Sequence, residues 1–322
     1  MGQRDPSSSK GVLNALWHYI SNRFPIPWLP LVAINRFLLI YLAIHGLADS
    51  MSLISPTTIS IGCFSCVLLL FTQRISDDLL DETGDRNLAA QGVLKYQQRP
   101  LVSGAISSTT LVSCRRWVFA AILVTQIPLM LSQVGGLNRV MTLIIPAACY
   151  LYINHLSSKL SPYLAGSSAL AFVCYAISLY AYDNGGLHWL IESSGYSLKE
   201  IAYPVALLSL IAWLPIQLWQ LTKRVKEATE ARHGSWREEG VLFKLLALSI
   251  GTSLALALVL SNLTLTWVLL PLCVLLSLAV LVQVSSFRSR VLHPWLIKAT
   301  GYLALFQYVS IPAAIIVTSA FF

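Results

Sequence analysis

The chain has 322 residues, of which 56% are hydrophobic and only 11% are charged, and its formal net charge is +8. A soluble domain carries about 25% charged residues and gives its surface helices polar faces, so this composition argues against a soluble globular protein. The basic excess alone would suit a nucleic-acid partner, but its placement along the chain has another explanation, given below, and we expect no nucleic-acid partner.

The apolar residues come in long blocks. About 20 consecutive apolar residues cross a bilayer as a helix, because every backbone polar group in lipid must be hydrogen-bonded within its own segment. The sequence therefore predicts an all-α polytopic membrane protein, a single domain over residues 1–322 with an N-terminal cytosolic or interfacial segment at 1–27. Nine transmembrane helices are expected around a central cavity, at 28–48, 57–75, 114–133, 138–156, 164–182, 201–221, 242–261, 265–284 and 299–320.

The basic residues lie mainly on one side of these spans. With the N-terminus in the cytosol, 19 of the 22 Lys and Arg residues are cytosolic, Arg139 and Lys199 lie opposite, and Arg36 lies within the first span. This asymmetry follows the positive-inside rule and accounts for the net charge. We expect an integral membrane protein of the endoplasmic reticulum, surrounded by lipid, with its N-terminus and long loops in the cytosol and no obligate protein partner.

Arg36 stands beside Asn35 in the first predicted span. An ionisable group inside a membrane segment is unfavourable and usually faces a polar cavity. We therefore expect Arg36 and Asn35 to face a bound anionic substrate. The alternative is that the Arg36 side chain extends to the membrane interface.

Two predicted cytosolic loops are long and charged, residues 76–113 and 222–241, and we expect both to form helical caps. The first begins with Ser-Asp-Asp-Leu-Leu-Asp-Glu-Thr-Gly-Asp. If the second span continues as a helix, Asp78, Asp81 and Asp85 lie on one face, and Asp77 lies one turn from Asp81.

Such closely spaced carboxylates repel one another unless cations neutralise them. Mg²⁺ prefers oxygen ligands, commonly one or two carboxylates with phosphate and water completing its shell. The sequence therefore predicts Mg²⁺ as cofactor, held by the aspartates of this segment. A solvated acidic helix end is the alternative, but acids at a helix C-terminus oppose the helix dipole.

Lys95 and Arg99 follow the acidic segment, and Pro100 and Gly104 mark a turn before the third span. Lys95 and Arg99 lie one turn apart if this segment is helical. Both side chains are suited to phosphate oxygens, and Arg binds them with a bidentate fork. We expect both residues to bind the phosphates of the substrate.

Together these residues resemble the UbiA superfamily of intramembrane prenyltransferases. The first signature of that family is Asn-Asp-x-x-Asp-x-x-x-Asp, followed by Arg-Pro-Leu-x-Ser-Gly. Residues 77–85 match it with Asp77 at the Asn position, and residues 99–104 match the second part. The resemblance covers essentially the whole chain and implies an all-helical fold, a magnesium cofactor and an isoprenyl diphosphate substrate, with Asp78, Asp81 and Arg99 as catalytic residues.

The second family signature, Asp-x-x-x-Asp-x-x-x-Gly, is expected after the sixth span. Glu230 and Gly234 take the positions of the second acid and the glycine, whereas Lys226 replaces the first acid. The resemblance implies that Glu230, with the nearby Glu227, holds the second metal. Lys226 and its neighbour Arg224 are then expected to bind the diphosphate.

A third family element is a Tyr and Lys pair that contacts diphosphate at the end of the fourth span. It corresponds loosely to Tyr152 and Lys159. The resemblance implies that both bind diphosphate and that Lys159 takes part in catalysis. The alternative for Lys159 is a loop cation that only sets the topology.

Two reaction types divide this superfamily. In both, the diphosphate leaves and an allylic carbocation forms, which a transferase passes to an acceptor and a cyclase folds onto its own double bonds. The Asp77-Asp78-x-x-Asp81 start and the altered second signature are similar to the fungal branch of membrane-bound terpene cyclases. We expect a sesquiterpene cyclase acting on farnesyl diphosphate, with an aromatic prenyltransferase as the alternative. A transporter is disfavoured, because its ionisable residues would lie near the bilayer midplane.

Overall fold

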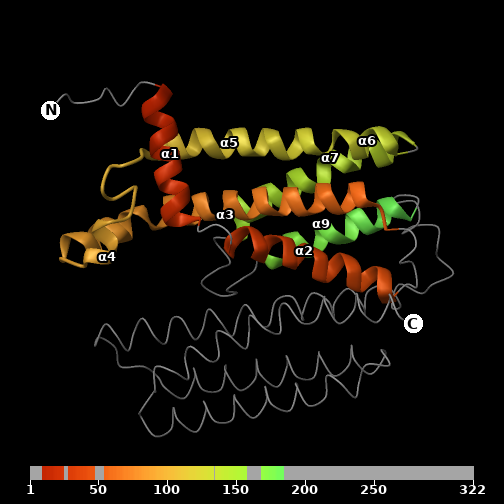
Figure 1. Cartoon of the computed structure of the whole chain (residues 1–322), viewed down its shortest axis with the longest axis horizontal. Helices are drawn as coiled ribbons and strands as arrows, with labels where there is room; N and C mark the ends of the chain where they lie inside the picture. The colour runs from red at the N-terminus through yellow and green to blue at the C-terminus, as the bar shows by residue number, and fades with distance from the viewer. Residues whose placement is uncertain (1–8, 25–27, 48–53, 134, 158–167, 185–322) are drawn as a thin grey trace, which may run out of the picture. The chain divides into compact units, whose positions relative to one another are not determined.

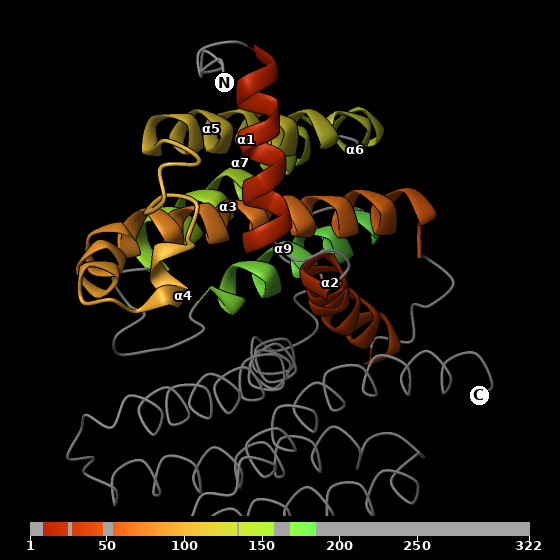
Figure 2. The ribbon, with the colours of Figure 1, turned by 60° about the vertical axis from the view of Figure 1, so that its left-hand side comes forward.

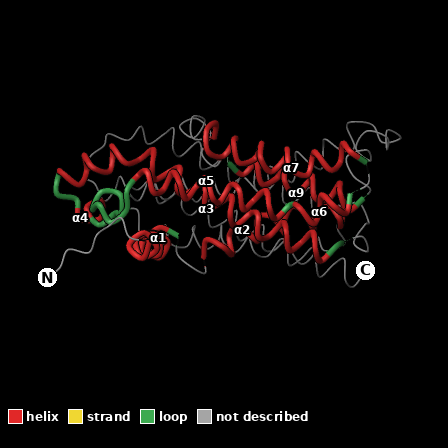
Figure 3. The backbone as a smooth tube through the Cα atoms, turned by 90° about the horizontal axis from the view of Figure 1, so that it is seen from above, coloured by secondary structure: helices red, strands yellow, loops and turns green. Residues whose placement is uncertain are grey.

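The computed structural model describes residues 9–24, 28–47, 54–133, 135–157 and 168–184 (Figure 1). All regular elements among them are helices, without a strand, as the tube in Figure 3 makes plain. The all-α prediction is confirmed for this part of the chain. The elements are α1 (Ser9–Arg23), α2 (Trp28–Leu47), α3 (Pro56–Ala90), α4 (Leu94–Gln97), α5 (Ser108–Thr125), α6 (Ile127–Ser132), α7 (Gly136–Leu151), the π-helix η2 (Tyr152–Leu156) and α9 (Ala169–Asp183).

Several described helices match predicted spans. Three helical segments are long and apolar enough to cross a membrane: Pro56–Ala90, Ser108–Ser132 and Gly136–Leu156. They cover the second, third and fourth predicted spans. The shorter apolar helices α2 and α9 lie at the first and fifth. The last four predicted spans and the loop 222–241 lie outside the described residues, so the count of nine stays a prediction.

The chain divides into two compact units, with one boundary inside α2 after Ile34. The first unit contains α1, the start of α2, and the helices from α3 to η2. The second contains the rest of α2 together with α9. The acidic segment therefore belongs to the first unit, and the prediction of a single domain stays a prediction.

Helix α3 continues without a break from its apolar part through the acidic segment, and a glycine ends it. Gly92 has φ +86°, a conformation that other residues rarely adopt. Around it, Val93 N–H donates to Leu88 O at 3.3 Å and Gly92 N–H donates to Ala89 O at 3.0 Å. This is the Schellman pattern of helix ends, and it explains why the helix stops after Ala90.

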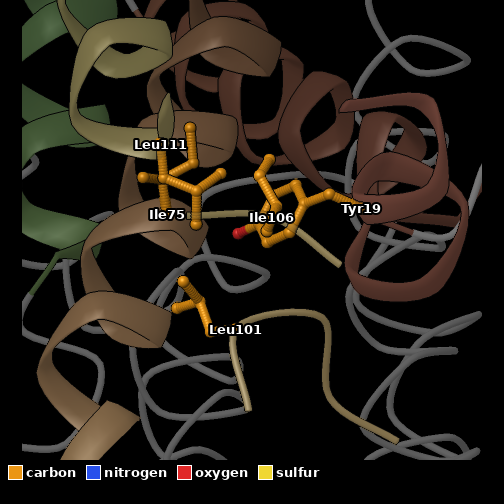
Figure 4. Packing of buried hydrophobic residues seen from close by; sticks show 5 residues of the cluster. All are labelled: Tyr19, Ile75, Leu101, Ile106 and Leu111. Carbon is orange, nitrogen blue, oxygen red and sulfur yellow. The ribbon is translucent and has the colours of Figure 1, made fainter. Parts of the chain in front are cut away.

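Helix α1 runs across α3 rather than along it (Figures 1 and 2). The two helices meet in an apolar cluster beside the acidic segment, where Figure 4 shows Tyr19 reaching toward side chains from α3, α5 and the connection between α4 and α5. Leu13 and Trp17, on the outside of α1, are about two-thirds exposed. The buried members of the cluster are Tyr19, Ile75, Leu101, Ile106 and Leu111.

Candidate functional site

The acidic segment forms two parallel rows of side chains on α3, because residues four positions apart lie one above another on a helix. One row is mixed in charge and the other is entirely acidic. The predicted span 57–75 ends before Ser76, so both rows apart from Arg74 lie beyond it. The mixed row is Arg74, Asp78, Glu82 and Arg86, and the acidic row is Asp77, Asp81 and Asp85.

Asp78 in the mixed row is buried, at 4% exposed, and its carboxylate is fully engaged. Tyr19 donates its hydroxyl to Oδ2 at 2.7 Å. Arg23 donates Nε to Oδ2 at 3.0 Å and Nη2 to Oδ1, which makes a bidentate pair. Arg74 Nη2 lies 3.7 Å from Oδ1. A carboxylate has about four acceptor positions, so these donors leave Asp78 little capacity for another ligand.

Glu82, one turn further along the mixed row, ties α3 to its neighbours. Its carboxylate accepts a hydrogen bond from Ser108 Oγ at 2.7 Å and from Arg86 Nη2 at 2.9 Å. The same Arg86 nitrogen donates to the Leu101 carbonyl at 3.0 Å. The Ser108 hydrogen bond, followed by the one from Arg86, lowers the pKa of Glu82. The mixed row is thus a set of structural contacts.

The acidic row is different. Asp77 is half-buried and Asp81 is exposed, and neither forms a hydrogen bond or ion pair within the described part of the chain. Burial raises the pKa of Asp77 to about 7, while Arg74 opposes the rise and Asp81 adds to it. Burial, then the nearby Asp85, also raises the pKa of Asp81. Two carboxylates one turn apart thus have no direct ion-pair partner among the described residues.

Asp85, at the end of the acidic row, is buried and forms an ion pair with Arg99. The Arg99 guanidinium also lies over the Tyr96 ring, 4.6 Å from its centre, and its Nε has no hydrogen-bond acceptor among the described residues. Lys95 Nζ lies 5.7 Å from the same ring. The structure thus brings both predicted phosphate-binding cations to Tyr96, beside the acidic row.

Lys95 and Arg99 do not share a helix. Helix α4 ends at Gln97, and the residue before a proline disfavours the helical conformation, so Pro100 excludes Arg99 from the helix. The predicted turn is present: Val102 N–H donates to Arg99 O at 3.0 Å, and Gly104 has φ +77°.

A buried polar network holds the start of the acidic segment. Ser76 donates its hydroxyl to Asn154 Oδ1 and accepts a hydrogen bond from Arg115 Nη1 at 2.9 Å. Asn154 donates to the Tyr150 carbonyl at 2.7 Å and to Thr72 Oγ1 at 3.4 Å. The network joins α3, α5 and the π-helix η2, which also contains the predicted Tyr152. π-helical turns are frequent at functional sites.

In the second unit, Arg36 lies over the Phe172 ring, 5.4 Å from its centre. Its Nε and Nη1 are buried and find no hydrogen-bond acceptor among the described residues. Asn35 precedes it on α2 and is half-buried. Unsatisfied guanidinium donors suit an anionic ligand, and the role of both residues stays a prediction. The other predicted site residues, Lys159, Arg224, Lys226, Glu227 and Glu230, lie outside the described residues.

Three residues of this site were missed by sequence reasoning: Tyr19, Arg23 and Arg74. Arg74 stands four residues before Asp78, and this spacing on a helix was a readable signal. Tyr19 and Arg23 share a face of α1 by the same spacing. Nothing in the local sequence indicates that their partner lies 59 and 55 residues away.

The donor set fits Mg²⁺ in part. No group of three or more His, Cys, Asp or Glu side chains is arranged to hold a metal in the portion of the chain that the structure describes. Asp77 and Asp81, however, offer two carboxylates one turn apart that have no partner among the described residues. Mg²⁺ sites that also use substrate phosphates commonly have one or two protein carboxylates. The pair therefore fits a magnesium ion that takes its remaining oxygens from diphosphate and water.

No protein-family model matches the sequence, and no curated protein sequence matches it. Among solved structures, the chain is similar to a digeranylgeranylglyceryl phosphate synthase in membranes, with a TM-score of 0.52 and 13% sequence identity. The match covers 95% of this chain and 99% of that chain. At this identity the similarity concerns the fold.

Proposed function

We propose that this chain is a membrane enzyme of the UbiA superfamily that ionises an isoprenyl diphosphate with Mg²⁺ as its cofactor. The observation that carries this proposal is the pair Asp77 and Asp81, which has no partner among the described residues and lies where the apolar part of α3 ends, beside the cations at Tyr96. An acidic pair next to an arginine and a lysine suits a ligand that brings both a metal and phosphate oxygens. The similarity of fold to a membrane synthase supports the same reading.

The residues have separable tasks in this proposal. Asp77 and Asp81 hold the metal. Asp85 follows them in the acidic row and Asp78 lies beside that row, and each of these two carboxylates is paired with an arginine. Lys95 and Arg99 bind diphosphate oxygens, and the ion pair with Asp85 orients the Arg99 fork. Further diphosphate contacts come from Arg36, Asn35, Tyr152, Lys159, Arg224 and Lys226, and a second metal is held by Glu227 and Glu230.

The first chemical step breaks the bond between the allylic carbon and the diphosphate oxygen. The electron pair leaves with the diphosphate, and the carbon becomes an allylic cation. When bound, Mg²⁺ supplies Lewis-acid stabilisation of the leaving group. The positive side chains of Arg99 and Lys95, which lie near Tyr96, stabilise the same developing negative charge on the leaving oxygens.

For the fate of the cation we propose cyclisation of farnesyl diphosphate to a sesquiterpene. An internal double bond supplies the electron pair of the new carbon–carbon bond, and the final cation loses a proton. Asp77 in place of the family's Asn, and Lys226 in place of its first acid, favour this fate over transfer.

Transfer to a phenolic acceptor is the second candidate, and the similarity of fold to a digeranylgeranylglyceryl phosphate synthase supports transfer in general. Here a carbon of the acceptor forms the new bond and then loses its proton. In either case the acidic segment is expected in the cytosol, with the protein in the endoplasmic reticulum membrane.

Product analysis separates these fates. Purified protein in lipid nanodiscs is given geranyl, farnesyl or geranylgeranyl diphosphate with Mg²⁺, first alone and then with a phenolic acceptor, and the extract is analysed by gas chromatography with mass detection. A hydrocarbon formed from farnesyl diphosphate without acceptor supports the cyclase. A product formed only with acceptor establishes the transferase, and no product under either condition refutes the proposed function.

A further inference from the structure

Helix α1 places two side chains on the acidic segment of α3. Tyr19, at 1% exposed, and Arg23 both donate to Asp78, with Tyr19 Oη at 2.7 Å and Arg23 Nε at 3.0 Å from Oδ2. Aromatic rings pack beside this contact: Tyr19 and Phe24 both make edge contacts with Phe71 of α3, at 6.5 and 5.1 Å between ring centres. The contact is therefore both polar and apolar, and α1 is firmly docked at this point.

The segment that α1 contacts is a poor helix by itself. The acidic row places Asp77, Asp81 and Asp85 at successive turns, and like charges at this spacing destabilise a helix. Gly84 lies inside the same stretch, where a glycine weakens a helix interior, and a Cβ added at this position would meet no other atom within 4 Å. Without a bound cation, contacts from elsewhere in the chain must keep this end of α3 helical.

We propose that Tyr19 and Arg23 are positioning residues that hold the end of α3 helical before the metal arrives, so that Asp77 and Asp81 already stand one turn apart. They act through Asp78, which neighbours Asp77 in the chain and lies three residues before Asp81. A metal site whose ligands are already in position loses less conformational entropy when it binds the ion. This inference rests on the proposed metal site and adds a role for α1 to it.

Two charge-conserving variants test the proposal. Tyr19→Phe removes one hydroxyl, and Arg23→Lys keeps the charge but loses the bidentate fork. Matched controls are Tyr182→Phe, whose hydroxyl has no hydrogen-bond partner in the described residues, and Arg116→Lys on the exposed side of α5. Full-length protein in nanodiscs is used throughout, and two quantities are measured: hydrogen exchange of peptides from residues 76–90, and Mn²⁺ affinity by electron paramagnetic resonance.

We expect exchange in residues 76–90 to rise at least about tenfold in both α1 variants and in neither control, since a lost hydrogen bond to a charged group changes local opening by that much or more. Mn²⁺ affinity should fall about tenfold, as it does when outer-shell partners of a metal site are removed. Combining Tyr19→Phe with Asp78→Asn should add little to the effect of Asp78→Asn alone, because both act through one contact.

The outcomes against the proposal are distinct from those against the proposed function. If only α1 peptides exchange faster while 76–90 and Mn²⁺ affinity stay as in the wild type, the contact is merely structural and the proposal is overturned. Tighter Mn²⁺ binding in the variants would also overturn it, since α1 would then compete with the metal. If wild-type protein binds no Mn²⁺ at all, the metal site and the proposed function fail together with it.

Discussion

Asp78 and Asp81 lie three residues apart on α3, but their neutral amide variants should fail in different ways. Asp81 is exposed and forms no hydrogen bond or ion pair within the described residues, so Asp81→Asn breaks no contact there. As a lost metal ligand it should reduce kcat/KM at least about 100-fold, which corresponds to about 2.7 kcal/mol of transition-state stabilisation. Its thermal stability should not fall, because the variant removes one of the mutually repelling charges of the acidic row.

Asp78→Asn removes a charge that Tyr19 and Arg23 share. Asp78 and Arg23 side chains are 5% and 15% exposed, so this is a largely buried ion pair. Breaking such a pair costs about 3–5 kcal/mol, and the partial exposure of Arg23 places the expected loss near about 3 kcal/mol. The apparent Tm should therefore fall by several degrees, together with activity.

Both effects are measurable on the same preparations. Thermal unfolding is followed in detergent with EDTA, so that no metal contributes to stability, and turnover is followed with farnesyl diphosphate and excess Mg²⁺. Equal losses of Tm in the two variants would refute the separation of the two rows. Near-normal turnover by folded Asp81→Asn would remove Asp81 from the proposed metal site.

Three further predictions concern neighbouring residues. Arg99→Lys should raise the KM for the diphosphate substrate about tenfold, because it loses the fork that Asp85 orients, and an unchanged KM in initial-rate measurements would contradict a diphosphate contact. Asp77→Asn should raise the Tm in EDTA at pH 8 but not at pH 4: the folded pKa of Asp77 is raised to about 7, so its ionisation lowers stability as pH rises from about 4 to 7. Equal Tm changes at both pH values would contradict this. Asn154→Leu should lower the free energy of unfolding by about 2–3 kcal/mol, because it leaves buried partners unpaired, without changing the Mg²⁺ requirement; a changed requirement would place Asn154 in the site itself.

The continuous helix through the acidic segment was predictable from the sequence. Residues 57–90 contain no proline, the aspartates follow the apolar span directly, and Gly92 stands where a helix end would be expected. The spacing also predicted that Asp77 and Asp81 lie one turn apart. The local sequence therefore indicates where this helix begins and ends, although its acidic end also has contacts from elsewhere in the chain.

The division of the acids into Asp78 and Glu82, which have side-chain partners, and the pair Asp77 and Asp81, which has none among the described residues, was not predictable. It depends on Tyr19 and Arg23, which reach Asp78 across more than 50 positions of sequence, and on Ser108, 26 residues from Glu82. Helical spacing gives the face of each helix but not the partner that the face meets. The Ser76–Asn154 contact, which spans 78 residues, was missed for the same reason.

The proposed function requires that the acidic row supports ionisation of an isoprenyl diphosphate, whatever the fate of the cation. The most direct measurement is pyrophosphate release from farnesyl diphosphate by wild-type protein and Asp81→Asn in nanodiscs, with Mg²⁺ or EDTA, and with or without a phenolic acceptor. The proposed function predicts Mg²⁺-dependent release by the wild type that falls at least about 100-fold in the folded variant. Equal release by the two proteins, or none by the wild type under any of these conditions, would contradict it.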